Sequence, residues 1–200
     1  TNGKIIPLFF TSALLGFGSH ELLDTLAASA QSPFERKNIK ATNSKNELIN
    51  LNPKDAHVVA YVFKTNIDPF AGKLNIVRIF SGTLMPDAHV LNTTKNAKER
   101  IGSIIRMFGK KHELLKEACT GDIVALPKLK ETATFNTLTN EKNDIRISPI
   151  SVPSPLISYA AEAKTKGDED TMSTALHKIL DEDTSLAIKR SESGSELILT

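Results

Sequence analysis

The chain has no tryptophan and only one cysteine, and these shortages already exclude several kinds of site. A single thiol, Cys119, cannot form an internal disulfide and is expected to be a small buried apolar group. Five histidines are scattered without the spacing of a zinc site. No serine stands in a Gly-x-Ser-x-Gly arrangement that would mark it as a nucleophile. We therefore expect no catalytic residue and no metal site.

Long hydrophobic runs are also missing. The longest, such as Ile5 to Phe10 with Pro7 inside it, fall far short of the roughly 20 apolar residues that span a bilayer. No charged-then-apolar signal segment opens the chain. We expect a cytoplasmic protein without a membrane partner. Its apolar and charged fractions are those of an ordinary globular protein with a real core.

Charge of one sign is scarce as well, because the net charge is only +2. That value does not by itself indicate nucleic-acid binding, and we expect no DNA partner. The distribution is uneven, however. Cations gather between Lys95 and Lys116 with only Glu99 and Glu113 among them, whereas residues 168–183 are rich in acid. The pattern favours a local basic patch, and cations that merely solvate the outer face of a sheet would give the same pattern.

The first 54 residues predict little regular structure. Ile5 to Phe10 is typical of an apolar strand, and Ser19 is a good N-cap for a helix that reaches Ala30 before Pro33. One strand and one helix cannot make a domain, so this opening is expected to be the last piece of something larger. Residues 34–54 are polar and predict a linker or irregular segment.

The middle of the chain predicts a closed antiparallel β-barrel. Short β-branched runs alternate with turn signals, a spacing typical of barrels. The expected strands are Val58 to Phe63, Leu74 to Phe80, His89 to Leu91, Ile101 to Met107 and Ile123 to Leu126. Lys111 to Cys119 fits a helix equally well by propensity, and its periodicity does not decide. Residues 132–144 form another polar stretch.

A third, α+β unit is predicted after Pro149, Pro153 and Pro155. A strand is expected within residues 157–163, then a helix after Gly167-Asp168 with apolar residues at helical spacing. A hairpin over residues 186–199, turning at Ser193-Gly194, completes a β-α-β-β order. The acids at Asp181, Glu182 and Asp183 are expected to be a solvated helix end.

Nucleotide-binding motifs are absent from the sequence. No Gly-x4-Gly-Lys-Ser/Thr loop occurs, since Gly72-Lys73 is followed by Leu74, and the Asn-Lys-x-Asp base-reading motif is missing. We therefore expect this chain neither to bind GTP tightly nor to hydrolyse it, and predict that it is not itself an enzyme.

The order of several motifs resembles bacterial elongation factor G. Ser12-Ala13-Leu14 resembles the guanine-recognition Ser-Ala motif at the end of the GTP-binding domain. The barrel segments resemble domain II in Asp68-Pro69-Phe70-Ala71-Gly72-Lys73-Leu74, Ser81-Gly82-Thr83-Leu84, Lys98-Glu99-Arg100-Ile101-Gly102 and Thr120-Gly121-Asp122-Ile123. Glu162-Ala163-Lys164-Thr165-Lys166 and the helix after it resemble domain III.

The resemblance implies a specific organisation and partner. It implies the end of a GTP-binding domain over residues 1–36, a translation-factor β-barrel over 54–140 and an incomplete ferredoxin-like domain III over 150–200. The barrel would bind small-subunit rRNA of the ribosome, with candidate contacts Arg78, Lys95, Lys98, Arg100, Arg106, Lys110 and Lys111. GTP and magnesium would belong to the longer parent GTPase, whose cofactor contacts here would be only Ser12, Ala13 and Leu14. The incomplete domain III would contact the barrel or pair with a neighbouring chain.

Departures from the family pattern leave alternatives open. Met85-Pro86-Asp87-Ala88 replaces the family's glycine-containing turn, and residues 134–138 stand where a Gly-Asp pair is customary. These changes suggest a divergent paralogue or a tetracycline-resistance type ribosomal protection protein instead of the housekeeping translocation factor. A stand-alone β-barrel protein or enzyme of unknown substrate is the remaining alternative.

Overall fold

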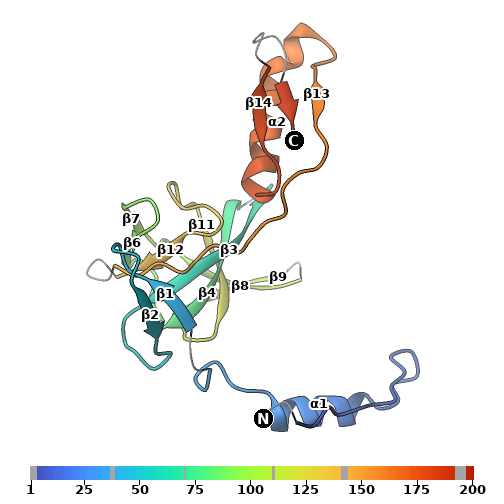
Figure 1. Cartoon of the computed structure of the whole chain (residues 1–200), viewed down its shortest axis with the longest axis vertical. Coiled ribbons are helices and arrows are strands. Elements are labelled where there is room, and N and C mark those ends of the chain that lie inside the picture. Colours follow the sequence, from blue (N-terminus) through green and yellow to red (C-terminus); the bar gives the residue numbers. More distant parts are fainter. Residues whose placement is uncertain (1–3, 37–38, 70, 110, 141–143, 192–196) are drawn as a thin grey trace.

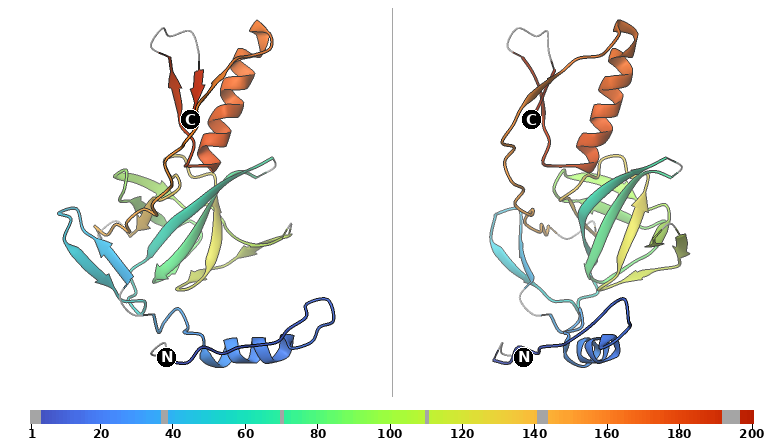
Figure 2. Two further views of the ribbon diagram at one scale, coloured as in Figure 1. Left: turned by 45° about the vertical axis from the view of Figure 1, so that its right-hand side comes forward. Right: turned by 90° about the vertical axis from the view of Figure 1, so that its right-hand side faces the viewer.

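The structure is a computed structural model that describes residues 4–36, 39–69, 71–109, 111–140, 144–191 and 197–200. Three parts follow one another along the chain: an arm with helix α1, a β-rich body, and a C-terminal α+β unit (Figure 1). Figure 2 shows the arm below the β-rich body and the C-terminal unit above it. Within the described residues no helix has the length and apolarity needed to cross a membrane.

The β-rich body is built on one antiparallel sheet of eight strands in the order β7-β6-β12-β3-β4-β11-β8-β9. Strands β7 and β8 stand at or next to opposite ends of this order, yet only residues 101–103 join them. Four Cα steps of about 3.8 Å span at most roughly 15 Å. The sheet must therefore curl until its ends meet, which confirms the predicted barrel. Its strands are β3 (Val59–Asp68), β4 (Gly72–Ser81), β6 (His89–Asn92), β7 (Ala97–Arg100), β8 (Ile104–Phe108), β9 (Lys111–Leu115), β11 (Ile123–Pro127) and β12 (Thr137–Thr139).

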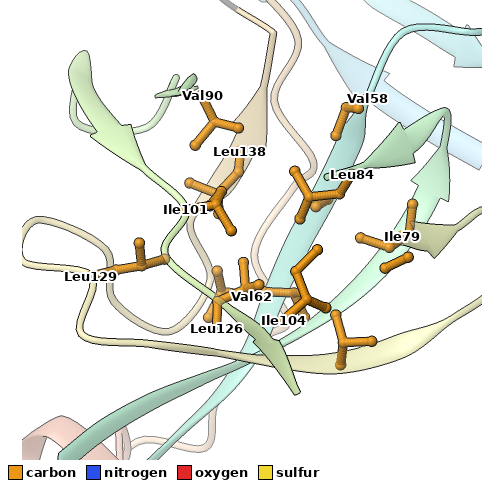
Figure 3. Close-up of a cluster of buried hydrophobic side chains, with 14 residues drawn as sticks. Val58, Val62, Ile79, Leu84, Val90, Ile101, Ile104, Leu126, Leu129 and Leu138 are labelled. Carbon is orange, nitrogen blue, oxygen red and sulfur yellow. The ribbon is translucent and has the colours of Figure 1, made fainter. Parts of the chain in front are cut away.

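One hydrophobic cluster fills the barrel (Figure 3). Alternate residues of β4, Val77 and Ile79, are fully buried, and so are Val62 of β3 and Leu126 of β11. Ile101 lies in the short connection between β7 and β8 and is also fully buried, so this connection seals the core where the sheet ends meet. The two-residue strands β5 (Thr83–Leu84) and β10 (Ala118–Cys119) pair with each other, and Leu84 and Ala118 add to the core.

The predicted strand positions are mostly correct, and the ambiguous segment resolves as β structure. Residues 111–119 form β9 and β10 and not a helix, because β9 pairs along its whole length with β8. Strands β3 and β4 are longer than predicted and pair through to the hairpin end at Asp68 and Gly72. The strand expected from Ile101 begins at Ile104, and β7 before it was not predicted.

Two further β elements lie where the sequence predicts irregular structure. The expected linker over residues 34–54 contains the hairpin of β1 (Ile39–Thr42) and β2 (Leu48–Leu51). Ile39, Ala41 and Leu51 bury one face of this hairpin against Val59, so a short apolar alternation outweighs the polar composition. The polar stretch 132–144 contains β12, whose three residues are all buried between β3 and β6.

The opening of the chain differs from its prediction. Residues 4–11 form no strand, because strand hydrogen bonds need a neighbouring strand and the described residues offer none there. Helix α1 (Ser19–Ser29) forms as predicted, but Gly18 and not Ser19 is its N-cap. Gly18 has a left-handed φ of 73°, and a Cβ there would overlap the carbonyl oxygen of Phe10, so only glycine fits. No residue of α1 is buried, so its apolar stripe has no partner within the described residues.

The C-terminal unit has the predicted β-α-β-β order. Strand β13 (Tyr159–Ala161) leads through the short 3-10 helix η1 (Lys166–Asp168) into α2 (Glu169–Glu182). Strands β14 (Ile188–Arg190) and β15 (Leu197–Leu199) complete an antiparallel sheet in the order β13-β15-β14. The expected turn at Ser193-Gly194 lies outside the described residues. The mainly β fold with an α+β unit is therefore confirmed.

Candidate nucleic-acid interface

The β6–β7 hairpin presents two of the predicted cations at its turn and on its outer face. Asn92 shapes the turn, since its side-chain oxygen accepts the N–H groups of Thr94 and Lys95 at 3.2 and 3.1 Å. On β7 the side chain of Glu99 is buried while Lys98 before it is exposed. Because side chains alternate along a strand, Lys98 faces away from the core. The fold thus brings Lys95 and Lys98 together on one hairpin.

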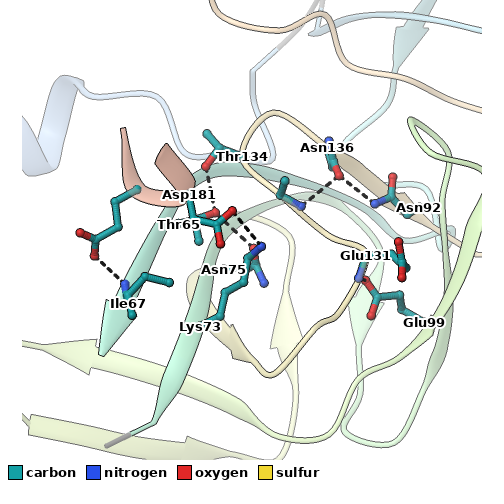
Figure 4. A network of polar contacts seen from close by, with 12 residues as sticks. Thr65, Ile67, Lys73, Asn75, Asn92, Glu99, Glu131, Thr134, Asn136 and Asp181 are labelled. Atoms are coloured by element: carbon teal, nitrogen blue, oxygen red, sulfur yellow. Dashed lines mark hydrogen bonds and ion pairs between the residues drawn. The ribbon is translucent and has the colours of Figure 1, made fainter. Parts of the chain in front are cut away.

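Glu99 joins this hairpin to the loop that follows β11. Its carboxylate accepts the N–H of Lys130 at 2.9 Å, the N–H of Glu131 at 3.1 Å and the hydroxyl of Thr132 at 2.5 Å. Only 9% of Glu99 is exposed, and these three donors satisfy a charge that would otherwise be costly to bury. The contact fixes the backbone of residues 130–132 beside β7 (Figure 4).

This loop adds two lysines that sequence reasoning missed. Lys128 and Lys130 are exposed on either side of Leu129, which is buried in the barrel core. The N–H of Lys128 donates to the carbonyl of Lys73 at 3.0 Å, which fixes the start of the loop to β4. An apolar anchor between two lysines was the only signal in the sequence. We call Lys95, Lys98, Lys128 and Lys130 the basic ridge.

A buried polar layer supports the ridge from inside the barrel. The side-chain amide of Asn92 donates to Asn136 at 2.9 Å, and the same oxygen of Asn136 accepts the N–H of Ala133 at 3.0 Å. Figure 4 shows these contacts beside the Glu99 loop. Farther along, Thr134 donates to Thr65 at 2.8 Å. Because hydrogen-bonded side chains fix both the turn after β6 and the loop after β11, the lysines stand on a rigid frame.

The other predicted cations do not extend the ridge into one patch. Arg100 lies on the same face of β7 as Lys98, but it forms an ion pair with Asp87 at 2.9 Å. Arg78 lies on the outer face of β4, opposite Tyr61 and Ile123 in neighbouring strands. Arg106 and Lys111 lie on the β8–β9 hairpin, at the other end of the sheet order. Lys110 lies outside the described residues. The predicted set is therefore divided over several places and does not form one patch.

The candidate nucleotide residues lie on the N-terminal arm. Ser12 bridges to Phe17, with its N–H donating to the Phe17 carbonyl at 2.9 Å, and its hydroxyl accepts the N–H of Leu15 at 3.4 Å. Ala13 and Leu14 stand on the exposed turn between them, and Leu14 is 95% exposed. Among the described residues no His, Cys, Asp or Glu group is arranged to hold a metal ion. The arrangement does not fit a complete nucleotide and magnesium site.

The C-terminal end of α2 meets the β3–β4 hairpin of the barrel. The N–H of Ile67 donates to the carboxylate of Glu182 at 2.5 Å, and Lys73 lies 3.5 Å from Asp181 (Figure 4). The hydroxyl and N–H of Ser185 lower the pKa of Asp183 from its ordinary value, with a smaller contribution from Lys64. Carboxylates at a helix C-terminus are unfavourable beside the helix dipole, and the Ile67 N–H and Lys73 of the barrel compensate those of Glu182 and Asp181. The end of α2, which was predicted to be solvated, therefore partly contacts the barrel.

The connector between barrel and C-terminal unit is tied to the barrel surface. The N–H of Ile150 donates to the hydroxyl of Tyr61 at 3.3 Å, and the N–H of Ile147 donates to Thr137 at 3.0 Å. The ring of Tyr61 stacks on Phe135 with 6.5 Å between centroids. Burial raises the pKa of Tyr61 above its ordinary value, and the bond from Ile150 acts in the opposite direction.

Comparison of the chain with known proteins identifies the family to which it belongs. The model of elongation factor G domain 2 matches residues 57–141, and the model of Elongation Factor G domain III matches residues 152–200. A crystal structure of a protein from Thermus thermophilus matches with a TM-score of 0.72 and 26% sequence identity. The match covers 91% of this chain and 25% of that chain, so the present chain spans about a quarter of that protein. With the barrel and the β-α-β-β unit each matched by a consecutive domain of the same family, this chain belongs to the elongation factor G family.

Proposed function

We propose that the barrel binds the sugar-phosphate backbone of small-subunit rRNA through the basic ridge, as the ribosome-contacting part of an elongation-factor-G-like protein. The observation that carries the proposal is the buried Glu99 carboxylate, which holds the loop after β11 against β7, so that two segments carrying exposed lysines are fixed to each other. Phosphate contacts of this kind position a protein on RNA without reading its sequence. Membership of the family supplies the ribosome as the expected partner.

The ridge predicts a specific salt dependence. Four lysines that each neutralise one phosphate give a slope of log affinity against log salt of roughly −3 to −4. Raising monovalent salt from about 50 to about 200 mM should then weaken the contribution of these four contacts to binding by roughly 50- to 150-fold. Filter binding of the chain to purified small ribosomal subunits measures this slope. Binding whose affinity does not change with salt would overturn the proposal.

Matched variants separate the ridge from general charge. Lys98→Gln and Lys130→Gln should each reduce the magnitude of the slope by roughly 0.7 to 0.9. Glu131 is exposed beside the ridge, so Glu131→Gln should strengthen binding. Lys189→Gln, on β14 in the C-terminal unit, also removes one exposed cation and should leave binding unchanged. An equal loss for Lys189→Gln and Lys130→Gln would show that only net charge matters.

The parent activity follows from the family. We infer that the full-length protein is a cytoplasmic GTPase that acts in translocation, with GTP and magnesium held by a domain of which residues 1–36 form the end. The barrel domain would cover 54–140 and domain III would begin at 150. Ser12, Ala13 and Leu14 would contribute guanine contacts only beside that larger domain. Calorimetry with GTP should detect no micromolar binding by the present chain.

The alternatives give different outcomes in the same assays. A tetracycline-resistance type ribosomal protection protein would also bind small subunits, and the full-length parent would then restore translation in the presence of the drug. A stand-alone barrel enzyme would show no salt-dependent binding to ribosomes. Pairing between chains through the C-terminal sheet would appear as a concentration-dependent dimer in analytical ultracentrifugation.

A further inference from the structure

The β8–β9 hairpin extends away from the barrel body, on the side of β9 in Figure 1. Figure 2 shows in its left view the same hairpin reaching outward beyond the other strands. Strand β9 is last in the sheet order, and its first four residues are all exposed. The barrel core ends at the base of this hairpin, where Ile104 and Leu115 pair. Its outer part therefore does not serve the core.

One face of the hairpin combines an aromatic ring with two cations and one carboxylate. Phe108 pairs in register with Lys111, and Arg106 pairs with Glu113. Because paired residues point to the same side and alternate residues share a face, these four side chains lie together. Phe108 is 82% exposed, so its ring makes little contact with the protein. Arg106 lies 3.7 Å from Glu113, with half of its side chain exposed, and this weak pair leaves it accessible.

The combination selects one kind of partner. An exposed phenyl ring offers a flat face on which an unpaired base can stack, and neighbouring cations attract its phosphates. A protein partner that buried this ring would be expected to face more apolar neighbours, whereas Arg106 and Lys111 flank it. A paired base inside a duplex has no free face to offer. The chemistry favours a single-stranded RNA loop or bulge.

We propose that Phe108 stacks on an unpaired RNA base while Arg106 and Lys111 contact the adjacent phosphates. The inference rests on the proposed function, because it assigns a second contact to the same rRNA partner. Only its stacking part differs in character from the basic ridge. Stacking on a neutral ring depends little on salt, whereas the phosphate contacts of Arg106, Lys111 and the ridge lysines depend strongly on it.

The absence of tryptophan from the chain provides a direct assay. Phe108→Trp introduces a single indole at the exposed position, and a stacked base should quench its fluorescence. We expect saturable quenching of the full chain by a single-stranded RNA of about ten nucleotides, a length within the site sizes of stacking platforms. The blunt duplex of the same sequence and heparin should quench little. Equal quenching by heparin, or none by the single strand, would overturn the proposal.

Two further variants complete the test. Tyr159→Trp places an indole at another exposed position, on β13 of the C-terminal unit, since Tyr159 is 70% exposed, and should give no quenching. Phe108→Leu keeps an apolar side chain but removes the ring, and should weaken single-strand binding roughly tenfold with an unchanged salt slope. A Phe108→Leu variant that binds as tightly as the original chain would overturn the proposal. Circular dichroism checks that each variant is folded.

The two proposals fail in distinguishable ways. Loss of quenching with retained, salt-dependent binding to small subunits would remove the stacking contact and leave the ridge. Quenching by single-stranded RNA together with salt-independent binding to small subunits would overturn the ridge, and with it the rRNA context in which the stacking contact was placed.

Discussion

The substitution Glu99→Gln tests whether a buried carboxylate holds the basic ridge together. Three donors converge on Glu99: the N–H groups of Lys130 and Glu131 and the hydroxyl of Thr132, at 2.5–3.1 Å. Glutamine has nearly the same shape but offers only one oxygen acceptor. At least one donor then faces an amide N–H₂ group instead of an oxygen, and the charge that strengthens the remaining bonds is lost.

The magnitude follows from these contacts. A hydrogen bond to a charged group contributes about 1.5–3 kcal/mol, and an unsatisfied buried donor costs about 1–3 kcal/mol. Part of the loop backbone is close to solvent, so water replaces some of the lost contact. We expect Glu99→Gln to lower the free energy of unfolding of the barrel by about 2–4 kcal/mol.

Urea unfolding followed by far-UV circular dichroism measures this change, and hydrogen exchange at the Lys130 and Glu131 amides locates it. Exchange at both amides should accelerate in Glu99→Gln. Glu131→Gln is the matched control, because the same chemical change at an exposed side chain should stay within about 0.5 kcal/mol. If Glu99→Gln also stayed within about 0.5 kcal/mol of the original chain, the carboxylate would not be what joins the two segments.

Three other perturbations test the frame around the site. Gly82 has a φ of 72°, and a Cβ there would lie 2.7 Å from backbone atoms of the loop before β3, so Gly82→Ala should lower the free energy of unfolding by at least about 1–3 kcal/mol; an unchanged urea midpoint would contradict this. The raised pKa of Tyr61 means that its contribution to stability is complete below pH 10.0 and is lost as the pH rises through the higher folded value. Tyr61→Phe should therefore reduce the decline in melting temperature at alkaline pH, and hydrogen exchange at the Ile150 amide should become faster. An equal decline in both proteins would refute the role given to the Tyr61 hydroxyl. Glu182→Gln should accelerate exchange of the Ile67 amide several-fold, and protection equal to that of the original chain would mean that this carboxylate does not hold α2 on the barrel.

Much of the barrel could be predicted because its strands carry their own signal. In β4 the alternation of buried Val77 and Ile79 with partly exposed neighbours matches the period of a strand that faces a core on one side. Strand β12 carries no such signal. Thr137 and Thr139 are buried although polar, and hydrogen bonds satisfy both hydroxyls: Thr137 accepts the N–H of Ile147 in the connector, and Thr139 donates to the carbonyl of Asn140. No alternation of apolar residues marks such a strand in the sequence.

The error at the start of the chain has a physical cause. An apolar run such as Ile5 to Phe10 predicts a strand only if another strand accepts its hydrogen bonds. Its side chains are instead among the most exposed of the described residues, with Ile5 and Ile6 at 87% and 90%. Sequence periodicity reports what a segment could bury and says nothing of whether its partner is present.

Two of the four ridge lysines were predicted from the sequence and two were missed, because the sequence does not show which distant segments come together. Lys95 and Lys98 belong to one hairpin, so their proximity follows from local sequence. Lys128 and Lys130 lie on a loop much further along the chain, which the Glu99 contacts hold against β7 across separations of 31 to 33 positions. No local pattern announces such a contact, because it depends on how the sheet closes.

The salt titration of small-subunit binding tests the central claim most directly. The chain should bind purified small ribosomal subunits with an affinity that falls by at least roughly 50-fold between about 50 and about 200 mM monovalent salt. Lys98→Gln and Lys130→Gln should each make that decline shallower. Binding that is undetectable at low salt, or that does not respond to salt and to these lysines, would contradict the account.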